Sequence, residues 1–395
     1  MGNGNSSGFL SLNGSAFNTG DIVSGTFYLS VGSPLSVNSV SVRICGTEKV
    51  SWSESEYDPV AASINRRAQM MKLEGRTEAQ ISHALKGELS EWRARQLITS
   101  NFSFCSPGNL PESRSIPVSG GRDLLIFSVA VGGAGQLNGQ YSFPFRFQLP
   151  STCPGTFDYR QGDVSASISY KVEGFVDASG MLSSDLKYSV PVHVFERPQQ
   201  IRPVFSSNTS NVMCCCFSKG QVSFDVRTTK DCFSTGERLE VVANVNNQSQ
   251  KDVDSVVVEL YSNLELRAEG KSKTISIRTA SSEGERIPSG SNLQGMKLGL
   301  VVPLGIQQQA LGFVVRHFYS VKLRANISWA TDPECIVPIG IYNAATDALP
   351  VAPQMQAPAN WKPQEQPVVV IEVPALQSNP EGIDLNVFEG LQIVQ

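Results

Sequence analysis

Side chains that could perform acid–base, nucleophilic or metal chemistry are few and widely spaced in this sequence. The three histidines, His83, His193 and His317, lie far apart along the chain. The eight cysteines include no CxxC pair, a spacing typical of structural zinc sites. An enzyme would need a nucleophile beside a base, or a metal cluster. We therefore expect no catalytic residues, no metal site and no cofactor, although folding could bring distant side chains together.

The N-terminus carries a candidate lipidation site. The first six residues, MGNGNS, fit the N-myristoylation pattern, with Gly2 exposed after Met removal and Ser6 in place. One myristoyl chain binds a membrane only weakly, so a second signal would be needed. The same N-terminus has no basic region followed by an apolar core, so we expect no secretory signal and reduced cysteines in a cytoplasmic protein.

Composition limits the other classes of function. The 395 residues suit two or three domains, and 41% of them are hydrophobic, which is enough for sizeable cores. The formal net charge of −4 gives no general attraction to nucleic acid. No apolar run approaches the length of a transmembrane helix.

Most of the chain is predicted to form β-strands. Short runs rich in Val, Phe, Tyr and Thr, separated by many Gly and Pro residues, favour an all-β fold of β-sandwiches. The phrase FNTGD at 17–21 returns as FSTGE at 233–237, which predicts two similar immunoglobulin-like domains in tandem. We expect Gly20 and Gly236 to make the same turn in each, at positive φ. Phe143, Phe145 and Phe147 share one face of a strand, which predicts a core position.

One stretch, residues 59–99, carries the longest helical pattern in the sequence. Thr77-Glu-Ala-Gln80 is a capping box, in which the Thr and Gln side chains satisfy free backbone N–H groups. Gly75 separates it from an earlier helical segment at about 60–73. We predict a helical hairpin or broken helix that packs its apolar stripe on its own sandwich. Basic residues near the middle leave open an arm that binds a partner or a membrane: Arg66, Arg67, Lys72 and Arg76.

Proline-rich segments divide the chain. ERPQQIRP at 196–203 is a plausible interdomain linker. The predicted boundaries are 1–197 for the first domain with its helical insert, and 198–345 for the second. Residues 346–395, rich in Pro and Gln, are predicted to be mostly disordered. Within them, VVVIEV at 368–373 could form a strand on an open sheet edge.

With these elements in place, the sequence resembles the arrestin superfamily, and within it the arrestin-domain-containing (α-arrestin) branch. The most specific match is YSFPFRFQLPSTCPGTF at 141–157, similar to the family's Y-x-F-P-F-x-F-x-L-P segment. The resemblance covers roughly residues 9–345 and leaves out the helical insert and the tail. Other matching segments are TGDIVSGTFYLSV at 19–31, VNSVSVRICGTEKVSW at 37–52, ISYKVEGFVD at 168–177 and the Cys-rich stretch at 214–241.

The resemblance implies a non-enzymatic adaptor. Such proteins bind cytoplasmic segments of membrane proteins and link them to endocytic, trafficking or ubiquitin-ligase machinery, in the cytoplasm and at the plasma membrane or endosomes. This chain has no PPxY motif, so ligase recruitment by that route is in doubt. Cysteine-rich entries to the second domain recur in the family, so we favour packing over palmitoylation for Cys214, Cys215 and Cys216.

Three alternatives stay open. The first is a retromer-type coat subunit of arrestin fold in endosomal sorting, which co-purification with other retromer proteins would reveal. The second is an enzyme on a β-sandwich, the weakest of the three because the histidines are scattered. The third is a secreted adhesion module of tandem Ig-like domains, for which intact disulfides would be the evidence.

Overall fold

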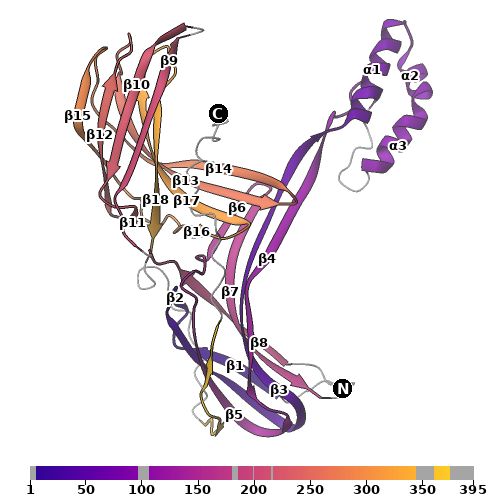
Figure 1. Cartoon of the computed structure of the whole chain (residues 1–395). Helices are drawn as coiled ribbons and strands as arrows, with labels where there is room; N and C mark the ends of the chain where they lie inside the picture. Colours follow the sequence, from indigo (N-terminus) through magenta and orange to yellow (C-terminus); the bar gives the residue numbers. More distant parts are fainter. Residues whose placement is uncertain are drawn as a thin grey trace. The chain divides into compact units, whose positions relative to one another are not determined.

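The computed structural model describes residues 6–96, 106–179, 186–198, 200–214, 217–343 and 360–373 (Figure 1). The chain divides into two compact units. The first unit comprises Met1–Val50, Gly120–Tyr159 and Ala166–Gln395, and it holds nearly all of the sheet structure. The second comprises Ser51–Ser119 and Arg160–Ser165, and it contains the helices.

The N-terminal strands form one sheet network, in the order β5-β3-β7-β8-β2, with β1 and β4 paired to β3 and β6 paired to β7. Two short strands from the far end of the chain, β19 (Gln364–Glu365) and β20 (Val369–Ile371), pair with β5. Two long strands, β3 with 36 residues and β4 with 20, each have residues in both units. The strands are β1 (Ser6–Leu12), β2 (Ala16–Asn18), β3 (Ile22–Tyr57), β4 (Ser113–Gly132), β5 (Gly135–Gln148), β6 (Phe157–Gln161), β7 (Val164–Ala178) and β8 (Leu186–Phe195).

The C-terminal strands form a sandwich of two sheets. One has the order β15-β12-β10-β9, and the other has the order β11-β18-β17-β13-β14, with β16 on β17. Inward-facing residues of both sheets make one buried cluster, as expected for alternating strands. The strands are β9 (Val204–Cys214), β10 (Phe217–Thr228), β11 (Cys232–Ser234), β12 (Arg238–Asn247), β13 (Ser255–Ala268), β14 (Lys271–Glu283), β15 (Asn292–Val301), β16 (Ala310–Leu311), β17 (Val315–Asn326) and β18 (Glu334–Tyr342).

The second unit contains three helices within the described residues, α1 (Pro59–Leu73), α2 (Glu78–Ala84) and α3 (Lys86–Gln96). The capping box of Thr77 and Gln80 is present. The apolar stripe packs between the helices, in a cluster of Ile64, Ile81, Leu85, Leu89, Trp92 and their neighbours. The prediction that it packs on the sandwich was therefore wrong: three short helices bury their stripes against one another. No described helix is long and apolar enough to cross a membrane.

The repeated phrase makes the same turn twice. Gly20 and Gly236 have φ of 84° and 80°. Asp21 N–H donates to Asn18 O at 3.0 Å and Glu237 N–H to Ser234 O at 3.1 Å. The carboxylates of Asp21 and Glu237 accept the N–H groups of Asn18 and Ser234 in return. The strands β2 and β11 that enter these turns pair in parallel with β8 and β18.

Candidate functional site

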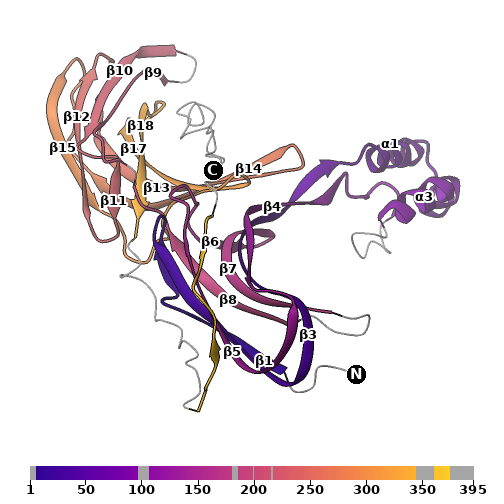
Figure 2. The ribbon, with the colours of Figure 1, turned by 60° about the horizontal axis from the view of Figure 1, so that its bottom comes forward.

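The outer edge of β5 holds a segment from the far end of the chain. The short strands β19 (Gln364–Glu365) and β20 (Val369–Ile371) pair with β5 in parallel. Gln366 N–H donates to Ser142 O at 3.1 Å. In Figure 2 this yellow strand runs beside β5. The predicted strand at 368–373 is thus present on a sheet edge, while residues 346–359 and 374–395 of the predicted disordered tail lie outside the described residues.

Two side chains anchor the docked segment. Ile371 is only 4% exposed. Trp361 packs edge-on against Phe9 and Tyr28, with ring centroids 5.9 Å apart in both cases. Backbone pairing along an edge with pockets for a few side chains is a general mode of peptide recognition. The β5 edge can therefore accept an extended chain, and here it accepts this protein's own.

A second arrangement joins the N-terminal strands to the C-terminal sandwich. Glu48 of β3 is 0% exposed, and its carboxylate accepts three successive backbone N–H groups, those of Phe313, Val314 and Val315, at 3.0–3.2 Å. Three N–H groups in sequence form an anion-binding nest. The Arg122 guanidinium lies 3.9 Å above the Phe313 ring. A Cβ atom on Gly312 would collide with the Glu48 carboxylate, so this position has no room for a side chain.

Glu196, which follows β8, binds the residues just before Phe313. One Glu196 oxygen accepts the N–H groups of Gly155 at 2.9 Å and Leu311 at 3.0 Å. The other accepts Gln309 Nε2 at 3.2 Å. Gln308 Nε2 donates to Val194 O at 2.9 Å. We call residues 307–315 with Glu48 and Glu196 the clasp.

Gln307 completes the clasp. Its side chain mimics a strand partner: Nε2 donates to Asp158 O at 2.7 Å, and Oε1 accepts the Asp158 N–H at 3.2 Å. All three glutamines of the run 307–309 thus bind groups in the N-terminal strands or directly after them. No pattern in the sequence predicts this role, because a glutamine at an interface and a glutamine exposed to solvent have the same local sequence signal.

Burial sets the electrostatics of the clasp. It raises the pKa of Glu48, even though the three N–H donors and Arg122 lower it. Burial also raises the pKa of Glu196, against the donors from Leu311, Gly155 and Gln309. A carboxyl group whose pKa is raised by folding stabilises the folded state most below its unfolded pKa, and this contribution is lost as the pH rises through the folded pKa.

A pH prediction follows for Glu48→Gln, whose neutral side chain imitates the protonated acid. As the pH rises from about 4.5, the unfolding free energy of wild type should fall relative to that of the variant, because only wild type must bury a charge. Urea denaturation of both proteins from acidic to neutral pH measures the difference. A difference that does not change with pH would mean that burial does not perturb Glu48.

The remaining candidate residues lie apart from these sites. Gly2, Cys215 and Cys216 are outside the described residues, and Cys214 is half-buried at the end of β9. Phe143, Phe145 and Phe147 are all at most 2% exposed. No group of three metal-binding side chains occurs among the described residues.

One histidine has a serine partner. His317 Nε2 lies 2.9 Å from Ser262 Oγ, and its Nδ1 lies 2.9 Å from Gln308 O. The imidazole is 4% exposed, and burial lowers its pKa to about 4. A base this weak would be poorly matched to nucleophile activation at neutral pH. We interpret the pair as a structural hydrogen bond next to the clasp.

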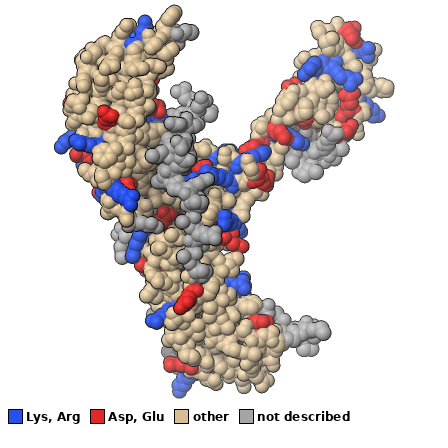
Figure 3. All heavy atoms as spheres, in the orientation of Figure 1, with Lys and Arg blue, Asp and Glu red and all other residues tan. Residues whose placement is uncertain are grey.

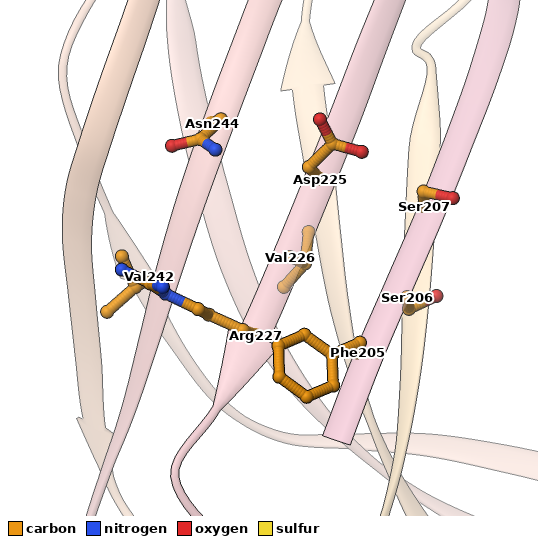
Figure 4. Close-up of a pocket in the computed structure, with 8 residues that line it drawn as sticks. All are labelled: Phe205, Ser206, Ser207, Asp225, Val226, Arg227, Val242 and Asn244. Carbon is orange, nitrogen blue, oxygen red and sulfur yellow. The ribbon is translucent and has the colours of Figure 1, made fainter. Parts of the chain in front are cut away.

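A shallow pocket lies on the β9–β10–β12 surface, with a volume of about 400 Å³. In Figure 4 the Phe205 ring lies beside Arg227, whose side chain extends toward Val242, with Asp225 and Asn244 farther along the same strands. Its charges are mixed, and no residue type in it points to a particular ligand.

Comparison with known proteins fits this architecture. The family model of the arrestin (or S-antigen) C-terminal domain matches residues 218–346. Arrestin domain-containing protein A of Dictyostelium discoideum is 31% identical over 140 residues, which cover 34% of this chain and 23% of that protein. Human arrestin domain-containing protein 4 is 30% identical over 173 residues (42% of this chain, 40% of that protein). Human arrestin domain-containing protein 1 is 26% identical over 264 residues (62% and 58%).

The fold and these similarities define the chain as an arrestin-like protein. Over part of its length, its sequence is similar to those of arrestin domain-containing proteins. The matched segments span less than two thirds of each of these three relatives.

Proposed function

We propose that this protein is a non-enzymatic adaptor that binds cytoplasmic segments of membrane proteins and links them to endocytic or trafficking machinery. The observation that carries the proposal is the β5 edge, which pairs with an extended chain through its backbone. Backbone pairing tolerates many sequences, as an adaptor with several cargoes requires. In this proposal, cargo and residues 360–373 compete for the same edge, and residues 1–197 and 198–345 act as the two modules.

The competition predicts binding of the tail segment in trans. A protein truncated after residue 345 should bind a fluorescent peptide of residues 360–373, measured by anisotropy. The full-length protein should bind it at least about tenfold more weakly, because its tethered copy acts at an effective concentration in the millimolar range. A peptide carrying Trp361→Ala and Ile371→Asp is the matched control and should bind neither protein.

Equal binding of the peptide to both proteins would contradict competition at this edge. The adaptor function itself is tested by proximity labelling in cells, with the full-length and truncated proteins compared. We expect membrane proteins and trafficking components in both sets, with more membrane-protein cargo for the truncated form. Labelling confined to soluble proteins would reject the adaptor proposal, and a stable set of retromer proteins would favour the coat-subunit alternative.

Gly2 is part of the proposal as a peripheral membrane contact. Labelling with alkyne myristate should mark wild type and not Gly2→Ala, because acylation requires the N-terminal glycine. Equal labelling of the two proteins would remove lipidation from the account.

A further inference from the structure

The helical unit is held together by specific hydrogen bonds as well as by its apolar cluster. Asp58 caps α1 through the N–H groups of Val60 and Ala61, and its second oxygen accepts Trp92 Nε1 at 2.8 Å. Asn65 holds the returning chain at Leu110 by two hydrogen bonds, of 2.8 and 2.9 Å. Together with the apolar cluster, these contacts fix α1 on one side and leave its other side facing outward.

The outward side of α1 is apolar at its C-terminal end. Ser63, Arg66, Met70 and Leu73 follow at spacings of three, four and three residues, which puts them on one face. That face lies opposite the buried Ala61, Ile64 and Ala68. Met70 is 57% exposed and Leu73 is 84% exposed. Two large apolar side chains beside the turn at Gly75 form a small wedge.

The charged residues of α1 itself are all basic. α1 carries Arg66, Arg67 and Lys72 and no Asp or Glu, and Arg76 follows in the next turn. In Figure 3, Lys and Arg gather on the part of the helical unit where α1 lies. Three of these cations have exposed acidic partners: Arg67 with Glu88, Lys72 with Glu78, and Arg76 with Glu74. Exposed pairs contribute little, so anionic headgroups can replace the carboxylates as partners.

We propose that the outer face of α1 is a contact site for an anionic phospholipid bilayer. Leu73 and Met70 enter the boundary between headgroups and acyl chains, while Arg66, on the same face, stays at the headgroup level. This is how an interfacial helix with a basic polar face binds. A projecting wedge suits a bilayer better than a protein partner, which would need a groove to match it. The inference stands whether or not the adaptor proposal holds.

Vesicle flotation tests the site with the full-length chain, produced without myristoylation. Wild type should float with phosphatidylcholine vesicles containing about one third phosphatidylserine, and less at high salt, where charge attraction is screened. The double variant Met70→Ser, Leu73→Ser should partition at least about tenfold less, because each apolar side chain no longer gains from burial. Both positions are exposed, so far-UV circular dichroism and thermal unfolding should be unchanged.

Two control variants separate this face from other exposed apolar residues. Ile126→Ser and Trp329→Ser remove side chains that are 56% and 90% exposed outside the helical unit. Both should float like wild type. Absence of wild-type binding overturns the proposal, as would undiminished binding of the Met70, Leu73 variant or loss of binding with Trp329→Ser alone. Arg66→Glu should weaken binding to the anionic vesicles at low salt.

Discussion

Replacing Glu48 with Ala is expected to lower the free energy of unfolding by about 3 kcal/mol. The change leaves three backbone N–H groups, those of Phe313, Val314 and Val315, without an acceptor. Each buried donor left unpaired costs about 1–3 kcal/mol. Removing the carboxylate returns part of its own desolvation cost, so the net loss is smaller than the sum.

Denaturant titration measures the total loss of unfolding free energy, and hydrogen exchange shows which residues lose protection. The amides of Phe313–Val315 should lose protection first, because their acceptor is gone. Glu240→Ala, at an exposed position of β12, is the matched control and should change stability by no more than about 0.5 kcal/mol. If Glu48→Ala matched this control and kept slow exchange at residues 313–315, the clasp would not hold the sandwich as described.

The second large effect concerns the helical unit. Trp92→Ala should destabilise it by about 3–5 kcal/mol, because a large buried ring is lost and a cavity remains. Trp92 is 1% exposed and belongs to the small cluster between the helices. A unit of this size has little stability to spare. We therefore expect α1–α3 to unfold while the sandwich strands stay folded.

Hydrogen exchange of residues 59–96 and the helical circular dichroism signal measure this outcome. Trp92→Phe keeps most of the ring volume but loses the hydrogen bond to Asp58, so its effect should be smaller. Ser90→Ala, at an exposed position on the same helix, should have none. If the helices and the sandwich unfolded together in Trp92→Ala, the helical unit would not be independent.

Several elements could be predicted because their signals are local. The capping box at Thr77 and the alternation through Phe143, Phe145 and Phe147 depend on neighbours within a few residues. The repeated turns also follow this rule: in FNTGD and FSTGE, a glycine allows the positive φ, and a carboxylate closes the turn by accepting the N–H group of the residue three positions before it.

Other elements were missed because their reasons are distant. The strand β9 was not predicted: residues 204–213 fell between the expected linker at 196–203 and the Cys-rich stretch at 214–241, and their polar sequence shows little alternation. It becomes a strand by pairing with β10 at the edge of the sheet. The helical stripe was assigned to the wrong partner, because periodicity shows which face is buried and not what covers it.

The sequence by itself determined the all-β class, the tandem repeat and the resemblance to arrestins, since these rest on local patterns and matching segments. The tertiary structure alone decided which groups form the sites. Glu48 meets residues 313–315 only after the chain has folded back across more than half its length, and Ile371 reaches Phe147 in the same way. Hydrogen bonds between such distant residues depend on topology, and no local pattern encodes them.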